Sequence, residues 1–125
     1  MPPSLRQLAK SRAQFRCEYC RIGQATSVVS FHVEHIIPRQ HGGVTSEENL
    51  ALSCPHCNLH KGPNLAGMDP DTGEVTRLFH PRSDVWSEHF RLGNGQVTGL
   101  TAIGRTTVWL LTLTDDEQMA LRSLG

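Results

Sequence analysis

The feature that most constrains this chain is its set of four cysteines, which form two C-x-x-C pairs. The pairs are Cys17 with Cys20 and Cys54 with Cys57. Two disulfides could use four cysteines, but in a chain without an export signal this spacing is typical of a metal site. Four thiolates around Zn²⁺ make a closed tetrahedral site, which suits a structural role better than a catalytic one. We therefore expect a structural zinc that joins two distant segments.

The length of 125 residues favours one domain with one core. Zinc binding worth about 10–16 kcal/mol in apparent terms would stabilise such a small core substantially. No apolar stretch is long enough to cross a bilayer, and the N-terminus, Met1-Pro2-Pro3-Ser4-Leu5-Arg6, lacks the apolar centre of a secretory signal. We expect a cytoplasmic protein that makes no membrane contact.

Charge is distributed unevenly along the chain, although the formal net charge is zero. Residues 1–62 carry seven Lys/Arg and four Asp/Glu, whereas residues 63–125 carry five and eight. The basic surplus lies in the part that contains the cysteines. This favours a phosphate-binding face only weakly, because a solvated surface explains most individual arginines.

The first half of the chain predicts a β-β-α unit preceded by a helix. A capping-box pattern at Ser4 and helical spacing of apolar residues predict a helix over 4–15. Residues 28–37 are rich in β-branched side chains and predict a strand, with His32 and Glu34 on one face and Val33 and His35 on the other. A polar loop with paired glycines leads to a second strand over 50–53, and residues 58–61 have room for one or two helical turns.

The second half predicts a hairpin and a terminal helix. Asn94-Gly95 is a hairpin turn signal, and Thr114 to Glu117 form a second capping-box pattern, while 108–113 is ambiguous between helix and strand. The bulky residues of 78–90 are expected to pack over the cysteine pairs. The expected fold is thus α+β, a single domain over 1–125 with an N-terminal helix (1–16), a zinc-framed core (17–62) and a C-terminal hairpin and helix extension (63–125).

Glu34 and His35 offer two of the groups that phosphodiester cleavage needs. A carboxylate is a suitable ligand for Mg²⁺ or a similar cation, and an imidazole can take a proton from water near neutral pH. Taken alone, Glu34-His35 is better explained as an exposed, ion-rich strand edge. Asn49 opens the second strand and Asn58 follows Cys57 directly, so a second oxygen ligand lies beside the second cysteine pair. This combination favours a catalytic site.

The ordered set of motifs resembles the HNH endonuclease family. The resemblance is carried by Cys17-x-x-Cys20, Val33-Glu34-His35-Ile36-Ile37-Pro38, Gly42-Gly43, Asn49-Leu50 and Cys54-x-x-Cys57-Asn58-x-x-Lys61-Gly62. These motifs cover the middle third of the chain, and a compound pattern is far more specific than any single element. Residues 78–90 also resemble the C-terminal extension of some bacterial HNH proteins.

The resemblance implies a ββα-metal nuclease with a role for each of these residues. His35 would be the general base, Glu34 and Asn58 the ligands of one catalytic ion, and Asn49 a brace that keeps His35 aimed. Cleavage would leave a 5′-phosphate and a 3′-hydroxyl, and the four cysteines resemble those of members with a separate structural zinc. Asn58 stands where the family name has a histidine, and an oxygen ligand favours Mg²⁺ or Mn²⁺.

Three further polar residues each have two possible interpretations. His32 is a candidate third ligand, or a hydrogen-bonded histidine that supports the strand. Lys61 and Arg39 are candidate contacts to the nucleic-acid backbone, or ordinary solvated side chains. We expect the partner to be nucleic acid, DNA in preference to RNA, with other proteins as a candidate source of sequence specificity. The alternatives are a non-catalytic zinc module that binds nucleic acid and a protein-interaction zinc module, neither of which needs Glu34, His35, Asn49 and Asn58 together.

Overall fold

A computed structural model describes residues 1–124 as an α+β fold with three small antiparallel sheets. The helices are α1 (Pro3–Arg12), α2 (Pro55–Lys61), α3 (Trp86–His89), α4 (Ala102–Leu110) and α5 (Asp116–Ser123). The strands pair in chain order as β1 (His32–His35) with β2 (Leu50–Ser53), β3 (Ala66–Met68) with β4 (Val75–Arg77), and β5 (Phe90–Gly93) with β6 (Gln96–Gly99). No helix among residues 1–124 has the length and apolar character needed to span a membrane.

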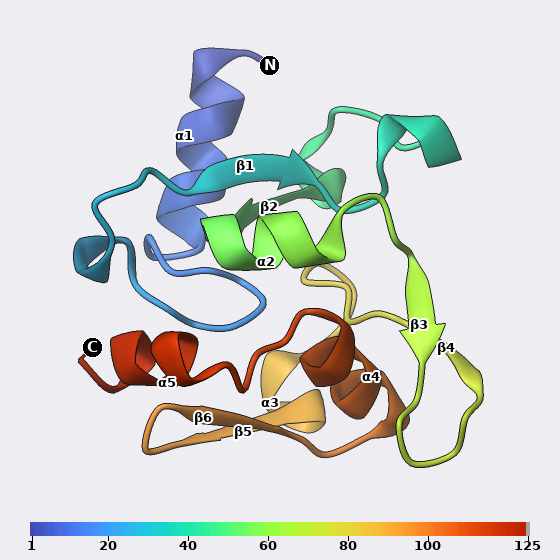
Figure 1. The fold of residues 1–125 in the computed structure, drawn as a ribbon. Helices are drawn as coiled ribbons and strands as arrows, with labels where there is room; N and C mark the ends of the chain where they lie inside the picture. The colour runs from blue at the N-terminus through green and yellow to red at the C-terminus, as the bar shows by residue number, and fades with distance from the viewer. Residues whose placement is uncertain (125) are drawn as a thin grey trace.

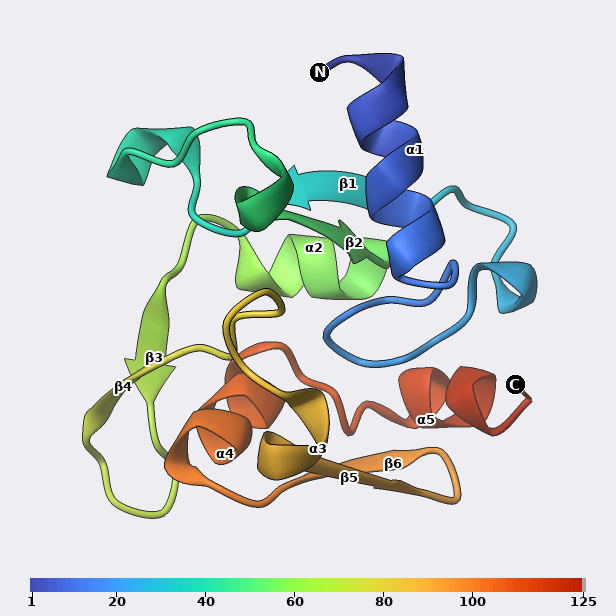
Figure 2. The same ribbon diagram turned by 180° about the vertical axis from the view of Figure 1, so that it is seen from behind.

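The β1–β2 hairpin lies between two helices, with α1 on one side and α2 on the other (Figures 1 and 2). His35 pairs with Leu50 and Glu34 with Ala51, so the long connecting loop starts and ends beside the catalytic candidates. All four residues of β2 are buried, which is expected for a strand covered on both faces. The expected β-β-α unit is therefore present.

Helix α1 starts and ends earlier than the sequence pattern predicts. The expected capping box at Ser4 does not form: Pro2 precedes the helix without a side-chain cap and Pro3 occupies its first turn, where a missing N–H costs nothing. The helix ends at Arg12 because Gln14 and Phe15 adopt φ values of 54° and 56°, which turn the chain toward the first cysteine pair.

The strand predicted over 28–37 is much shorter in the structure. β1 has four residues because β2 offers only four partners, from Leu50 to Ser53. Val28 and Val29 lie on the surface instead, where no strand pairs with them. Helix α2 is correspondingly longer than expected, since it begins at Pro55 and includes Cys57.

The C-terminal half contains the predicted hairpin and terminal helix. Asn94 and Gly95 have φ values of 52° and 78° and join β5 to β6, as a two-residue turn of this type requires. The cap of α5 is Asp115 rather than Thr114, because the Asp115 carboxylate accepts hydrogen bonds from the backbone N–H groups of Glu117 and Gln118. The ambiguous segment 108–113 continues α4 to Leu110 and then turns.

One hydrophobic core joins the two halves of the chain. It includes the four cysteines and Tyr19 together with buried side chains from the C-terminal half, namely Leu78, Phe79, Phe90, Val97, Leu111 and Leu113. The Trp86 indole N–H donates to the Tyr19 carbonyl at 2.9 Å, and the Arg82 guanidinium binds the Glu18 carboxylate. The prediction that 78–90 packs over the cysteine pairs is correct for the first pair, since Tyr19 and Glu18 lie between Cys17 and Cys20.

Candidate metal centre and active site

The four cysteine side chains meet in one buried cluster. Their sulfur atoms all lie within 4.8 Å of one another, and the Sγ atoms of Cys20 and Cys54 are 3.7 Å apart. A tetrahedral zinc site with Zn–S bonds of about 2.3 Å needs sulfur atoms roughly 3.8 Å apart. The four cysteines are therefore positioned to bind a metal ion with the spacing that zinc requires.

Local backbone geometry prepares each pair for this role. The Cys20 N–H points to Cys17 Sγ at 3.5 Å, and the Cys57 N–H points to Cys54 Sγ at 3.4 Å. The second contact also caps α2, because Cys54 is the residue that precedes its first turn. In both contacts a backbone N–H points to a sulfur atom that a metal ion would bind. The same sulfur atoms thus define the metal site and the start of the helix that carries Asn58.

Glu34 lies on the face of β1 that α2 covers. Its Oε1 atom is buried and has no hydrogen-bond partner among residues 1–124. Burial raises the pKa of the Glu34 carboxyl to about 7, and the nearby Lys61 ammonium partly offsets this rise. A buried carboxylate oxygen without a partner is costly, and a bound cation would supply the missing interaction.

Asn58 and Lys61 come from α2, which packs against β1. Asn58 is half-buried and its side chain makes no hydrogen bond among the described residues, so an amide oxygen is available beside the hairpin. Lys61 does not have the exposed side chain that the sequence suggested. Its side chain is 2% exposed, and Nζ donates to the Ile36 carbonyl at 3.0 Å. The structure therefore places Lys61 beneath the site, beside Glu34.

His35 faces away from Glu34, as alternation along a strand requires. Its Nε2 atom is 2.7 Å from Thr45 Oγ1, and Arg39 donates a hydrogen bond of 3.2 Å to the same hydroxyl. Partial burial, with help from the Arg39 guanidinium, lowers the pKa of His35 and favours the neutral imidazole at neutral pH. Nε2 is in contact with Thr45, and Nδ1 is the ring nitrogen without a hydrogen-bond partner among the described residues.

Asn49 holds the loop that follows His35. Its Oδ1 accepts from the Ile37 N–H at 2.9 Å, and its Nδ2 donates to the carbonyls of Ile37 and Val44 at 3.0 Å and 2.8 Å. Asn49 is buried, so these three bonds are protected from water. The side chain thus ties both ends of the segment between His35 and Thr45.

The remaining candidates are less closely tied to the site. His32 shares the face of Glu34 but is exposed, and the cysteines are the only group of three or more His, Cys, Asp or Glu within residues 1–124 placed to hold a metal. Arg39 is exposed and contacts Thr45. Thr45 was not predicted, because a threonine ten residues from a histidine carries no recognisable pattern. Its contact depends on the path of the loop.

Comparison with known protein families finds a match for the part of the chain that contains these residues. Residues 17–64 match the family model of the HNH endonucleases. The resemblance inferred from the motifs is confirmed for this HNH segment, which contains the four cysteines and every candidate catalytic residue. HNH proteins of this kind are generally nucleases, which suggests a nuclease-type function acting on nucleic acid.

One curated relative extends the similarity beyond the HNH segment. The chain is 27% identical over 106 residues to the Septu protein PtuB of Bacillus thuringiensis, a match that covers 83% of this chain and 38% of the relative. The chain therefore spans well under half the length of that protein. No solved structure matches this chain.

Proposed function

We propose that the chain is a metal-dependent endonuclease that hydrolyses phosphodiester bonds in DNA. The observation that carries the proposal is the buried Oε1 of Glu34, which lacks a hydrogen-bond partner among residues 1–124 and lies within a segment that matches the HNH endonucleases. Glu34 and Asn58 would hold one divalent cation. Mg²⁺ and Mn²⁺ fit best, because a hard cation accepts one carboxylate and one amide oxygen and takes its other ligands from water and the substrate phosphate. When bound, the cation would stabilise negative charge on the phosphate and on the leaving oxygen.

The proton transfer is assigned to His35. Nδ1 of the neutral imidazole would take a proton from the attacking water, in the tautomer that carries the ring proton on Nε2, where the ring would donate to Thr45 Oγ1. Asn49 would keep the loop in place around this pair. Lys61 would balance the Glu34 charge beneath the site. The proposed products are a 5′-phosphate and a 3′-hydroxyl.

The four cysteines are assigned to a structural Zn²⁺, separate from the catalytic cation. Their sulfur spacing supports zinc, and a set of four thiolates leaves no open position for a substrate. No sequence-reading element is assigned to this chain, so we propose that specificity comes from other protein segments or partners.

The test is cleavage of supercoiled plasmid by purified protein with Mg²⁺ or Mn²⁺. We expect His35→Ala to lower the rate by about 100-fold to 10,000-fold, the range for loss of a general base. Glu34→Ala and Asn58→Ala should weaken binding of the added cation, so that Mg²⁺ or Mn²⁺ no longer supports cleavage. Zinc content and melting temperature should stay unchanged. Glu88→Ala, on the exposed side of α3, is the matched control and should cleave normally.

The product ends test the chemistry further. If cleavage leaves a 5′-phosphate, 5′ labelling by a kinase requires prior phosphatase treatment. Equal cleavage by wild type and His35→Ala would overturn the assignment of the base. Binding of DNA without cleavage under any cation would instead support a non-catalytic zinc module.

A further inference from the structure

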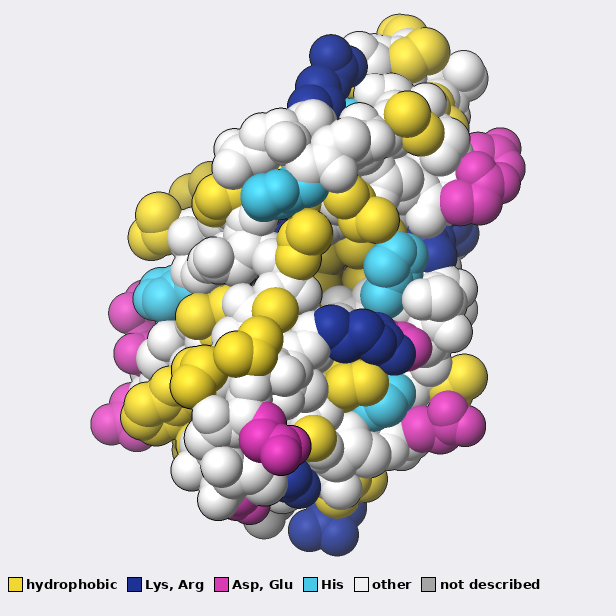
Figure 3. Space-filling view, turned by 90° about the vertical axis from the view of Figure 1, so that its right-hand side faces the viewer, with side chains coloured by type: hydrophobic (Ala, Val, Ile, Leu, Met, Phe, Trp, Pro, Cys, Tyr) yellow, Lys and Arg dark blue, Asp and Glu magenta, His cyan; other side chains and the backbone are white. Residues whose placement is uncertain are grey.

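A cavity of about 200 Å³ lies where the HNH segment meets the C-terminal half. One wall consists of Ile36, Lys61 and Leu65, and the other includes Phe79 and His80, which follow β4. The face that carries β3 and β4 shows hydrophobic side chains and histidines around a hollow (Figure 3). Because residues 77–80 complete the cavity, the HNH segment alone does not form it.

Lys61 links this cavity to the candidate active site. Its side chain lines the cavity, and its ammonium group interacts with the Glu34 carboxylate. Ile36 and Ile37, which follow His35 directly, line the same cavity. A nucleic-acid strand with its scissile phosphate at Glu34 would therefore bring a neighbouring nucleotide to the cavity.

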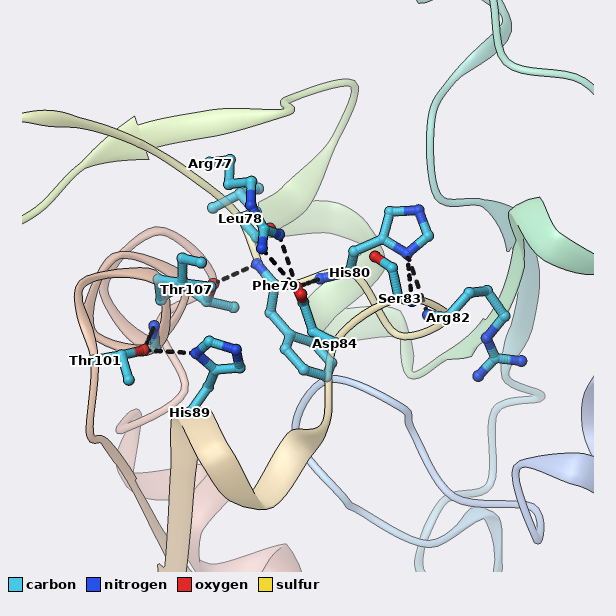
Figure 4. Close-up of polar contacts among 12 residues, drawn as sticks. Arg77, Leu78, Phe79, His80, Arg82, Ser83, Asp84, His89, Thr101 and Thr107 are labelled. Carbon is cyan, nitrogen blue, oxygen red and sulfur yellow. Dashed lines mark hydrogen bonds and ion pairs between the residues drawn. The ribbon is translucent and has the colours of Figure 1, made fainter.

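His80 presents a defined hydrogen-bond donor there. Its Nδ1 atom accepts from the backbone N–H groups of Arg82 and Ser83 at 3.1 Å and 3.3 Å (Figure 4). Two donors on Nδ1 leave the ring proton on Nε2. Burial lowers the pKa of His80, which also favours the neutral ring. Nε2 has no hydrogen-bond partner in the described part of the chain, so its N–H is available to a ligand.

The charges around the cavity favour an uncharged ligand over a phosphate. Arg77 lines the cavity but is held by Asp84 through two hydrogen bonds of 2.7 Å and 2.9 Å (Figure 4). The Lys61 ammonium donates to the Ile36 carbonyl at 3.0 Å. The walls are largely apolar, and no carboxylate of the described residues lines them. A flat ligand with apolar faces and an acceptor at its edge matches this arrangement.

We propose that the cavity binds one unpaired nucleobase beside the scissile phosphate, with His80 Nε2–H donating to an acceptor on the base edge. This inference rests on the proposed nuclease function and names its substrate class. A base can enter the cavity only when it is unstacked, and unstacking costs least in a single strand or at a mismatch. The enzyme should therefore prefer nucleic acid with unpaired bases at the cut over a fully paired duplex.

The test is binding of single-stranded oligonucleotides that contain 2-aminopurine, a base whose fluorescence reports unstacking. The His35→Ala protein serves as the binding form, with Mg²⁺ present, and DNA and RNA oligonucleotides are compared as separate arms. Adding His80→Asn should weaken binding by about 10-fold, which corresponds to the free energy of one buried hydrogen bond. Asparagine can still accept from the N–H groups of Arg82 and Ser83, but it lacks the donor at the Nε2 position.

A second variant pair tests the cavity itself. Leu65 lines the cavity and is 41% exposed, whereas Leu92 on β5 lies outside it and is 46% exposed. Leu65→Trp should fill the cavity and weaken binding, and Leu92→Trp should leave binding unchanged. Melting temperatures of all four proteins establish that each variant is folded.

The outcomes separate this inference from the proposed function. If His80→Asn and Leu65→Trp bind as tightly as their parent, or if the otherwise active enzyme cuts paired and unpaired substrates equally, the base-binding site is overturned and the nuclease remains. If binding depends on His80 and Leu65 while wild type cleaves nothing, the base-binding site is supported and the nuclease assignment fails.

Discussion

Thr45 is the residue whose contact most directly affects the proposed base. Its hydroxyl lies 2.7 Å from His35 Nε2 and also accepts from Arg39. Such a partner fixes the ring orientation. His35, the proposed general base, therefore depends on a side chain from the far end of the loop.

Thr45→Val should lower the cleavage rate by about 10-fold to 100-fold, as loss of an orienting partner typically does. The valine side chain has nearly the same shape, so the melting temperature should change little. Thr45→Ser retains the hydroxyl and should recover most of the activity. The measurement is the single-turnover rate at saturating Mg²⁺, and equal rates for valine and serine would show that the hydroxyl has no role.

The two glycines of the same loop are constrained in different ways. A Cβ atom on Gly43 would lie 1.6 Å from the Ile37 carbonyl oxygen, whereas a Cβ on Gly42 would meet nothing within 4 Å. Gly42 instead has a φ of 88°, which other residues adopt only with strain. Gly43 thus permits the close approach that the Asn49 hydrogen bonds depend on.

Gly43→Ala should destabilise the protein by more than about 2 kcal/mol, because the loop must move and release Asn49. Gly42→Ala should cost only about 1 kcal/mol, the price of a left-handed backbone for alanine. Chemical denaturation measures both values. A smaller loss for Gly43→Ala than for Gly42→Ala would contradict the close approach.

At the scale of elements, the cysteine cluster connects β2, α2 and the first knuckle, which is the turn that contains Cys17 and Cys20. Cys54 directly follows β2 and caps α2, and Cys17 and Cys20 belong to the knuckle that hydrogen-bonds to β2. The Glu18 carboxylate and its own backbone N–H both bond to Leu52, through the Leu52 N–H and carbonyl. We therefore expect a metal bound by the cysteines to fix the position of Asn58 relative to Glu34.

Cys17→Ser should unfold the protein or lower its melting temperature by tens of degrees, since bound zinc contributes about 10–16 kcal/mol in apparent terms. Metal analysis should show close to one zinc per chain for wild type and none for the variant. A Cys17→Ser protein with a normal melting temperature would refute the structural zinc. Catalytic-site variants such as Asn58→Ala provide the folded control.

For the whole molecule, the important contact is the one between the C-terminal half and the first knuckle. Trp86 reaches the Tyr19 carbonyl, and Arg21 lies over the Trp86 ring at 4.8 Å. Two ion pairs hold the C-terminal half in shape, one between Arg77 and Asp84 and one between Arg105 and Asp69. These pairs connect β4 to the segment before α3, and the turn after β3 to α4.

The same ion pairs predict an acid limit to stability. Hydrogen bonds from Arg105 and Arg77 lower the pKa values of Asp69 and Asp84 to about 2 from 3.8. A carboxylate with a lowered pKa stabilises the fold above its unfolded pKa, and this stabilisation is lost as the pH falls toward the folded value. The free energy of unfolding should therefore decrease between about pH 4 and pH 2.

Asp84→Asn isolates one of these contributions. The variant should be less stable than wild type at neutral pH, and the difference should shrink as the pH falls from about 4 to 2. Chemical denaturation at several pH values measures this difference. A difference that is independent of pH would show that the Asp84 charge contributes nothing.

Residues close together in the sequence were the ones whose arrangement could be predicted. The two C-x-x-C pairs, the Asn94-Gly95 turn and the β-β-α order follow from local spacing and backbone preference. Element ends were less predictable: β1 is limited by the length of its partner strand, and α1 by the turn into the knuckle. Both limits arise from neighbours in space.

By itself, the sequence determined the cysteine cluster, the hairpin and helix around it, and the identity of the candidate catalytic residues. Only the tertiary structure decided that Lys61 is buried beside Glu34, that Thr45 binds His35, and that His80 completes a cavity at the site. The physical reason is that burial and hydrogen bonding depend on which surfaces meet. Those surfaces belong to segments that only the common core brings together.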